Sequence, residues 1–268
     1  MNARTLAALA LLFLAALPVA AQDALQIVRS AVQSELAANK ADDTHWRFRD
    51  EERHLGTVSI VVETPQGAVK QAISRNGQPL TPAQRSEATA SVDEFIHDPS
   101  LQRKQRRDAA NDDKQAAELL NILPRAFLWT IRSDTAETVT LDYKPDPAFH
   151  PSDMEARVMS AMTGELVVDK QQHRIRTIRG HLTDDVTIGW GMLGRLKSGG
   201  TFDVERRQVA PGKWQITATS VHINGHALFF KNISEQQDEV KSGFVEVPNS
   251  TTLEQAAAML QDAVNKEH

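Results

Sequence analysis

The sequence predicts an α+β protein, mainly β, built on a curved antiparallel sheet: a half-barrel of roughly eleven strands with covering helices. Three observations predict it. Many segments alternate apolar and polar residues with the period of a half-buried strand. Short turn signals separate these segments, so the helical crossovers that a parallel sheet needs are missing. Helical periodicity is concentrated at the two ends and in one long insertion.

The first 21 residues predict a secretory signal peptide. Arg4 precedes the apolar run 6–16, and Pro18 is followed by the small residues Val19-Ala20-Ala21. The alternative is an uncleaved membrane anchor, but about 16 apolar residues fall short of the roughly 20 that span a bilayer. We therefore expect cleavage after Ala21. We also expect a periplasmic or secreted chain with no transmembrane segment, folded as one domain over 22–268.

The first part of this domain predicts a helix followed by strands. Leu25, Val28, Val32 and Leu36 recur at helical spacing within 23–38. Alternation then predicts strands at Trp46–Phe48, at 57–63 and at 68–75, separated by turn sequences.

A helical hairpin is predicted over 81–123, inserted after the third strand. Thr81 and Pro82 suit the N-cap and the first helical position, and Pro124 is expected to end the second helix. The basic block 103–107 could contact anionic headgroups or a partner. Asp108, Asp112 and Asp113 balance it, which favours a solvated helix face.

The second half predicts a meander that ends in a helix. Two strands, 126–132 and 138–144, precede a short helix at 152–161, and a last helix is expected at 252–264. Pro211-Gly212 and Asn224-Gly225 predict hairpin turns. The intervening strands are expected at 164–169, 173–179, 183–196, 201–209, 213–223 and 226–233.

Composition excludes several classes of function. The chain has no cysteine, which excludes disulfides, thiolate metal sites, a cysteine nucleophile and a lipidated N-terminal cysteine. The formal net charge of −5 argues against nucleic acid as a partner. No P-loop, GxSxG or HExxH motif occurs, so we expect no enzyme activity, no cofactor and no metal.

Three weaker chemical signals remain open. His222 and His226 would face each other across a hairpin at Asn224-Gly225, without an evident third metal ligand. Asp184-Asp185 are adjacent, so on a strand they would point to opposite faces, and turn aspartates are the simpler interpretation. The glycines within 189–194 suit curvature of the sheet better than phosphate binding.

Apolar surface is the remaining candidate for function. A curved sheet has a concave face, and a cavity there would suit a lipid or acyl chain. For any single residue, a place in a packed core is the alternative. The candidate ligand-binding residues are Trp129, Trp190, Met192, Phe202, Trp214, Phe229 and Phe230.

One local pattern carries a resemblance. Gly164-Glu-Leu-Val-Val-Asp169, followed by Arg174-Ile175, resembles paired strands of the periplasmic lipoprotein-carrier superfamily. The signal peptide, the leading helix and the meander are also similar to that superfamily, including its uncharacterised exported members. The resemblance implies a half-barrel with helices over an apolar cavity, and no catalysis. The charged insertion 81–123 departs from it, so lipoprotein transport itself is not implied.

Together these observations predict an exported, non-catalytic binding protein for a lipid or a lipidated partner. A module that binds another envelope protein or senses envelope stress is the second hypothesis. A hydrolase with an unrecognised site is the third. The ligand, the protein partner and the oligomeric state do not follow from the sequence.

Overall fold

One open antiparallel sheet organises the molecule. The computed structural model describes residues 19–188, 194–227 and 233–267. Within these ranges thirteen strands belong to one sheet, and its main path runs β4-β3-β2-β1-β13-β12-β11-β8-β7-β6-β5. β10 pairs with β12 and β9. Because the two edge strands do not meet, the sheet is open, which confirms the predicted mainly β fold with a curved sheet.

The strands and helices have the following bounds. The strands are β1 (His45–Glu52), β2 (Thr57–Thr64), β3 (Gly67–Arg75), β4 (Gln78–Pro79), β5 (Phe127–Asp134), β6 (Thr138–Pro145), β7 (Met162–Asp169), β8 (Ile175–Leu182), β9 (Val186–Ile188), β10 (Gly194–Leu196), β11 (Thr201–Ala210), β12 (Lys213–Ala227) and β13 (Ile233–Val247). The helices are α1 (Val19–Ala41), α2 (Pro82–His97), α3 (Pro99–Ala126), α4 (Met154–Met159) and α5 (Leu253–Glu267). None of these helices has the length and hydropathy to cross a bilayer.

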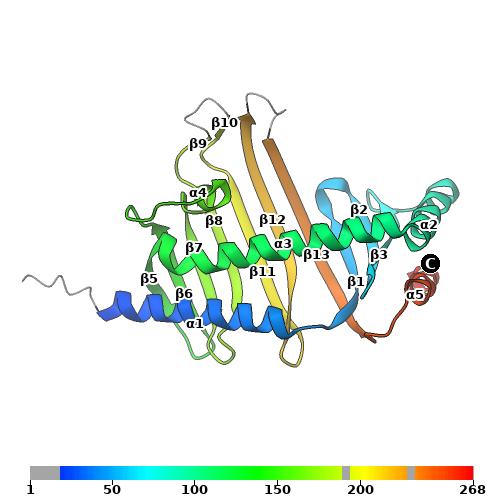
Figure 1. The fold of residues 1–268 in the computed structure, drawn as a ribbon, viewed down its shortest axis with the longest axis horizontal. Coiled ribbons are helices and arrows are strands. Elements are labelled where there is room, and N and C mark those ends of the chain that lie inside the picture. The colour runs from blue at the N-terminus through cyan, green and yellow to red at the C-terminus, as the bar shows by residue number, and fades with distance from the viewer. Residues whose placement is uncertain (1–18, 189–193, 228–232, 268) are drawn as a thin grey trace, which may run out of the picture.

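Helices α1 and α3 lie over the same face of the sheet, which we call the inner face (Figure 1). α1 buries Ala24, Val28 and Ala31 in a core that includes Leu141 of β6 and Leu166 of β7. Side chains alternate between the two faces of a strand, so the residues between these core positions lie on the opposite, outer face.

A second core lies at the other end of the sheet. Ile60 and Val62 of β2 pack with Leu253 and Leu260 of α5. Val61, between them, points to the other side and joins a small aromatic cluster that includes Trp46, Phe48 and Phe244. α3 crosses in front of the central strands and links the two ends of the sheet (Figure 1).

Two helix predictions differ from the structure. α3 continues through Pro124 to Ala126 instead of ending before it. Pro124 lies in the last turn of α3. Its missing N–H removes a single hydrogen bond from the end of the helix, and the helix tolerates this loss. α1 extends the predicted helix 23–38 at both ends.

Two further predictions were wrong, and one strand was missed. The predicted strand 183–196 contains two short strands, β9 and β10, which pair with each other. Asn224-Gly225 is not a hairpin turn, because both residues pair with β13 inside the continuous strand β12. Backbone pairing of β12 with β10 on one side and β13 on the other outweighs the turn preference of the Asn-Gly sequence. β13 was not predicted, although it pairs with both β1 and β12.

Glycines allow β7 and β8 to approach each other closely. Gly164 pairs with Gly180, in one row with Tyr143 and Phe202 of the neighbouring strands. A Cβ at Gly164 would overlap the backbone oxygen of Arg179 and lie 2.7 Å from the Gly180 Cα. A Cβ at Gly180 would overlap the Tyr143 hydroxyl. At position 164, only glycine fits without movement of the backbone.

We therefore expect Gly164→Ala to destabilise the fold by about 1–3 kcal/mol, because the added methyl must displace backbone. Urea unfolding followed by circular dichroism measures the change. Thr163→Ala is the control: Thr163 is the adjacent, half-buried residue on the outer face, and its loss should cost less than about 0.5 kcal/mol. Equal midpoints for wild type and Gly164→Ala would contradict the close-approach argument.

Candidate functional site

The inner face at the β5–β6 end is a packed core. The Trp129 ring packs edge-to-face against Phe127, with centroids 5.8 Å apart, and at a tilt against Tyr143, with centroids 5.4 Å apart. The Trp129 indole N–H donates to the Leu123 carbonyl of α3 at 3.3 Å. Burial raises the pKa of the Tyr143 hydroxyl, which donates to the Arg179 carbonyl at 2.9 Å. Trp129, predicted as a cavity residue, is therefore part of the filled interior.

A buried charge cluster fixes α1 to the sheet. Glu35 of α1 is fully buried. Arg174, just before β8, donates to both of its oxygens at 3.0 and 2.8 Å, and the Ile175 backbone N–H donates at 2.8 Å. Arg206 of β11 donates to the same carboxylate. Burial lowers the pKa of the Arg206 guanidinium, and the Glu35 charge opposes that shift. Two cations thus share one fully buried anion.

Trp214 of β12 belongs to the same cluster. The Arg174 guanidinium lies 5.8 Å from the Trp214 ring centroid, a cation–π distance. The Trp214 indole N–H donates to the Gln172 side-chain oxygen at 2.9 Å. Its ring is buried and its polar atom is paired, so Trp214 supports the cluster and does not line an open apolar cavity.

The middle of α3 is not packed against the sheet. Residues 109–116, which we call the strap, are exposed without exception over two helical turns. Before the strap, Gln105 exchanges hydrogen bonds with the Ala68 backbone of β3 at 2.7 and 3.0 Å. After it, Leu123 and Ala126 are buried in the α1 core. A helix exposed on all sides between two anchored ends bridges the inner face without filling it.

Apolar side chains remain accessible on the inner face of the central strands. Ile216 of β12 lies directly opposite Arg206, so it shares the inner face, and it is 41% exposed. Phe202 of β11 is partly buried at the margin of the α1 core. Of the predicted candidates that the structure describes, only Phe202 has this intermediate position.

Four predicted ligand-binding residues lie outside the described residues: Trp190, Met192, Phe229 and Phe230. The strands that flank them are described. β9 and β10, which flank residues 189–193, pair with each other through Ile188 and Gly194. β10 also pairs with β12, which precedes residues 228–232, through Gly194 and Ala227.

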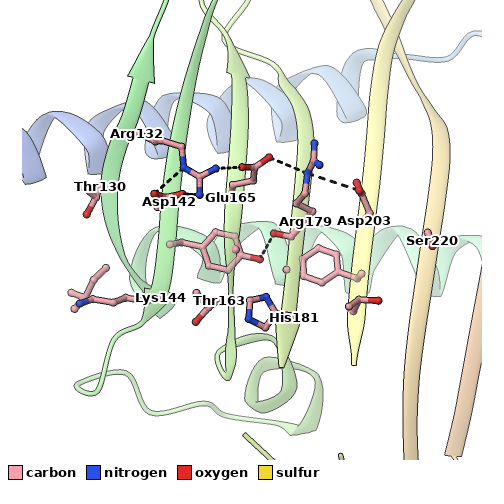
Figure 2. Close-up of a pocket in the computed structure, with 16 residues that line it drawn as sticks. Thr130, Arg132, Asp142, Lys144, Thr163, Glu165, Arg179, His181, Asp203 and Ser220 are labelled. Carbon is pink, nitrogen blue, oxygen red and sulfur yellow. Dashed lines mark hydrogen bonds and ion pairs between the residues drawn. The ribbon is translucent and has the colours of Figure 1, made fainter. Parts of the chain in front are cut away.

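The outer face carries a hollow of about 890 Å³ over β5–β8, β11 and β12. Figure 2 shows its charged side chains in front of the sheet, with α1 and α3 behind. Arg132 contacts Asp142 at 2.6 Å and Glu165 at 2.5 Å. Arg179 contacts Glu165 at 3.0 Å and Asp203 at 3.9 Å. These five residues, one from each of five strands, form a continuous chain of ion pairs, which we call the ladder.

The residues considered for catalysis fall along one strand and in a turn. His222 and His226 lie four positions apart along β12, about 13 Å in an extended strand, and do not face each other across a hairpin. Asp185 lies between β8 and β9, where it accepts the Ser198 backbone N–H at 2.8 Å. That hydrogen bond lowers the pKa of Asp185, as expected for a turn aspartate. No group of three metal-ligating side chains occurs within the described ranges.

The basic block 103–107 follows the first turn of α3, and its side chains have partners nearby. Lys104 pairs with Asp108 at 2.7 Å, and Arg106 donates to the Gln66 carbonyl at 2.5 Å. These contacts match a solvated helix face that also fastens α3 to the β2–β3 turn.

Sequence reasoning missed the buried cluster. The signal was a charged residue, Glu35, at helical spacing from the buried Val28, Ala31 and Val32. A carboxylate on the buried face of a helix requires a cationic partner. Arg174 appeared in the quoted strand pattern, but nothing in the sequence paired it with Glu35.

No protein-family model matches this chain, and no curated protein or solved structure shows significant similarity to it.

We expect Glu35→Gln to destabilise the protein by about 3–5 kcal/mol, because it leaves two guanidinium groups without a buried counter-charge. Thermal and urea unfolding measure the loss. Glu118→Gln is the control, since Glu118 is exposed on α3 and lies 3.8 Å from Lys114; its midpoint should equal that of wild type. An unchanged midpoint for Glu35→Gln would show that the cluster does not hold α1 in place.

Proposed function

We propose that the protein is an exported, non-catalytic binding protein that holds an acyl chain against the inner face of its sheet. The chain would belong to a lipid or to a lipidated partner. The observation that carries the proposal is the strap: a helix segment of eight consecutive exposed residues, anchored at both ends, that spans the inner face without packing on it.

The proposed contact differs in place from the one that the sequence suggested. Trp129 and Trp214 are committed to the core and to the charge cluster. The acyl chain would instead run between the strap and the central strands, over Ile216 and Phe202. Ile216 is only 41% exposed, so covering the exposed part of its side chain contributes about 1 kcal/mol, which suits reversible binding of an apolar chain.

A protein-binding role is the second candidate. The strap presents Asp112, Asp113 and Lys114 to solvent, and none of them contacts the sheet core. Charged residues on an exposed, rigid helix suit recognition of another envelope protein. Asp112→Lys/Asp113→Lys would disrupt such binding while acyl-chain retention stayed intact, which separates the two candidates.

The direct experiment is mass spectrometry of organic extracts from the mature protein, purified without detergent and incubated with membrane vesicles. We expect a stoichiometric phospholipid or acyl chain. An extract without lipid would contradict the proposal and favour the protein-binding role.

Ile216→Glu tests the proposed position of the chain. A carboxylate at this point of the inner face should lower lipid retention about tenfold or more, since it replaces apolar contact with a charge that must be desolvated. Leu55→Glu is the matched control, because Leu55 is 56% exposed on the turn after β1. Equal retention by Ile216→Glu and wild type would place the acyl chain elsewhere.

A further inference from the structure

The outer hollow contains a second row of polar residues beside the charge ladder. Lys144, Thr163 and His181 come from the neighbouring strands β6, β7 and β8 and lie in one row in Figure 2. Thr163 pairs directly with His181. Lys144 follows Tyr143, which pairs with Gly164, so the same register places Lys144 beside Thr163. The row therefore offers an ammonium group, a hydroxyl and an imidazole in sequence.

The ladder does not use these groups. Each carboxylate of the ladder forms an ion pair with Arg132 or Arg179, and none forms one with Lys144 or His181. Lys144 and His181 are exposed and make no hydrogen bond or ion pair with any described side chain. The free cationic group and the imidazole thus flank Thr163.

The spacing suits a compact anion. Neighbouring strands lie about 4.8 Å apart, so the Lys144 and His181 backbones are separated by about 9.6 Å. A phosphate-sized group above Thr163 would be within reach of the Lys144 ammonium from one side and the His181 ring from the other. Charge-assisted hydrogen bonds of this kind are the strong ones.

The opposite end of the hollow offers an acceptor. Burial raises the pKa of Asp203, and the nearby Arg179 charge only partly offsets this. The Asp203 Oδ1 atom is buried, but the side chain as a whole is 39% exposed, so the carboxylate remains open to a ligand hydroxyl from the hollow. Asp203 lies two residues along β11 from Thr201, which pairs with His181, so it is about 7 Å farther along the sheet.

We infer that this hollow is a second binding site, independent of the inner face, for a phosphate-class anion that carries hydroxyl groups. The anion binds over Thr163 between Lys144 and His181, and a hydroxyl donates to Asp203. A free polyol phosphate and a glycerophosphate headgroup share this chemistry.

Titration of the full mature chain with glycerol 3-phosphate, followed by NMR, tests the inference. We expect saturable shifts of the His181 ring and no shifts from glycerol. Parallel titrations with phosphatidylglycerol and phosphatidylcholine vesicles identify the source. Response to glycerol 3-phosphate alone assigns a free ligand, and response to phosphatidylglycerol but not phosphatidylcholine assigns a headgroup.

Lys144→Gln should weaken binding about tenfold or more, through loss of one charge-assisted hydrogen bond. Lys40→Gln is the matched control, since Lys40 is an exposed lysine at the end of α1. His181→Asn, with His54→Asn as its control, keeps the test valid if Lys144→Gln fails to fold. The inference is overturned if neither glycerol 3-phosphate nor phosphatidylglycerol binds, or if both site variants bind as wild type. These outcomes are separate from acyl-chain retention on the inner face.

Discussion

The contact of Glu35 with Arg174 and Arg206 is the constraint on which the inner face depends. A single carboxylate on α1 joins the start of β8 to β11, and Trp214 of β12 lies against Arg174. Burying three charges is expensive, and apolar residues of equal size are often as stable. What the cluster adds is position, because a carboxylate with two guanidinium partners accepts only one register of the helix. α1 is therefore fixed along its axis, which apolar packing at Val28 and Ala31 does less strictly.

The strap follows from this arrangement. With α1 fixed over β5–β8, the α1 core offers one anchor for α3 at Leu123, and the β2–β3 turn offers the other at Gln105. The helical stretch from Gln105 to Leu123 rises about 27 Å between these anchors, out of about 42 Å for the whole of α3. A helix this long that is held at both ends needs no packing in its middle. The exposed residues 109–116 are thus a consequence of where the two cores lie, and the sheet below them keeps Ile216 accessible.

Local patterns in the sequence were sufficient for most elements of the fold. Alternation identified β2, β3, β5 and β6, and the Thr81 cap marked the start of α2. Pairing between segments distant in sequence was not predictable. β13 is polar along much of its length, since it lies mid-sheet where both faces are partly open. Its strand conformation depends on its pairing with β1 and β12. Glu35 and Arg174, 139 residues apart, meet through packing. The outer ladder likewise needs the strand order, which alternation along single strands does not contain.

Strand alternation separates the two faces chemically. On β6, Leu141 and Tyr143 fill the inner core, while Asp142 and Lys144 point to the outer hollow. On β7, Leu166 is buried and Glu165 binds Arg132 and Arg179. Because neighbouring residues serve opposite faces, an apolar ligand on the inner face and an anion on the outer face would be held by different side chains of the same strands. The paired glycines at 164 and 180 join these strands closely, so the backbone is the one element that both faces share.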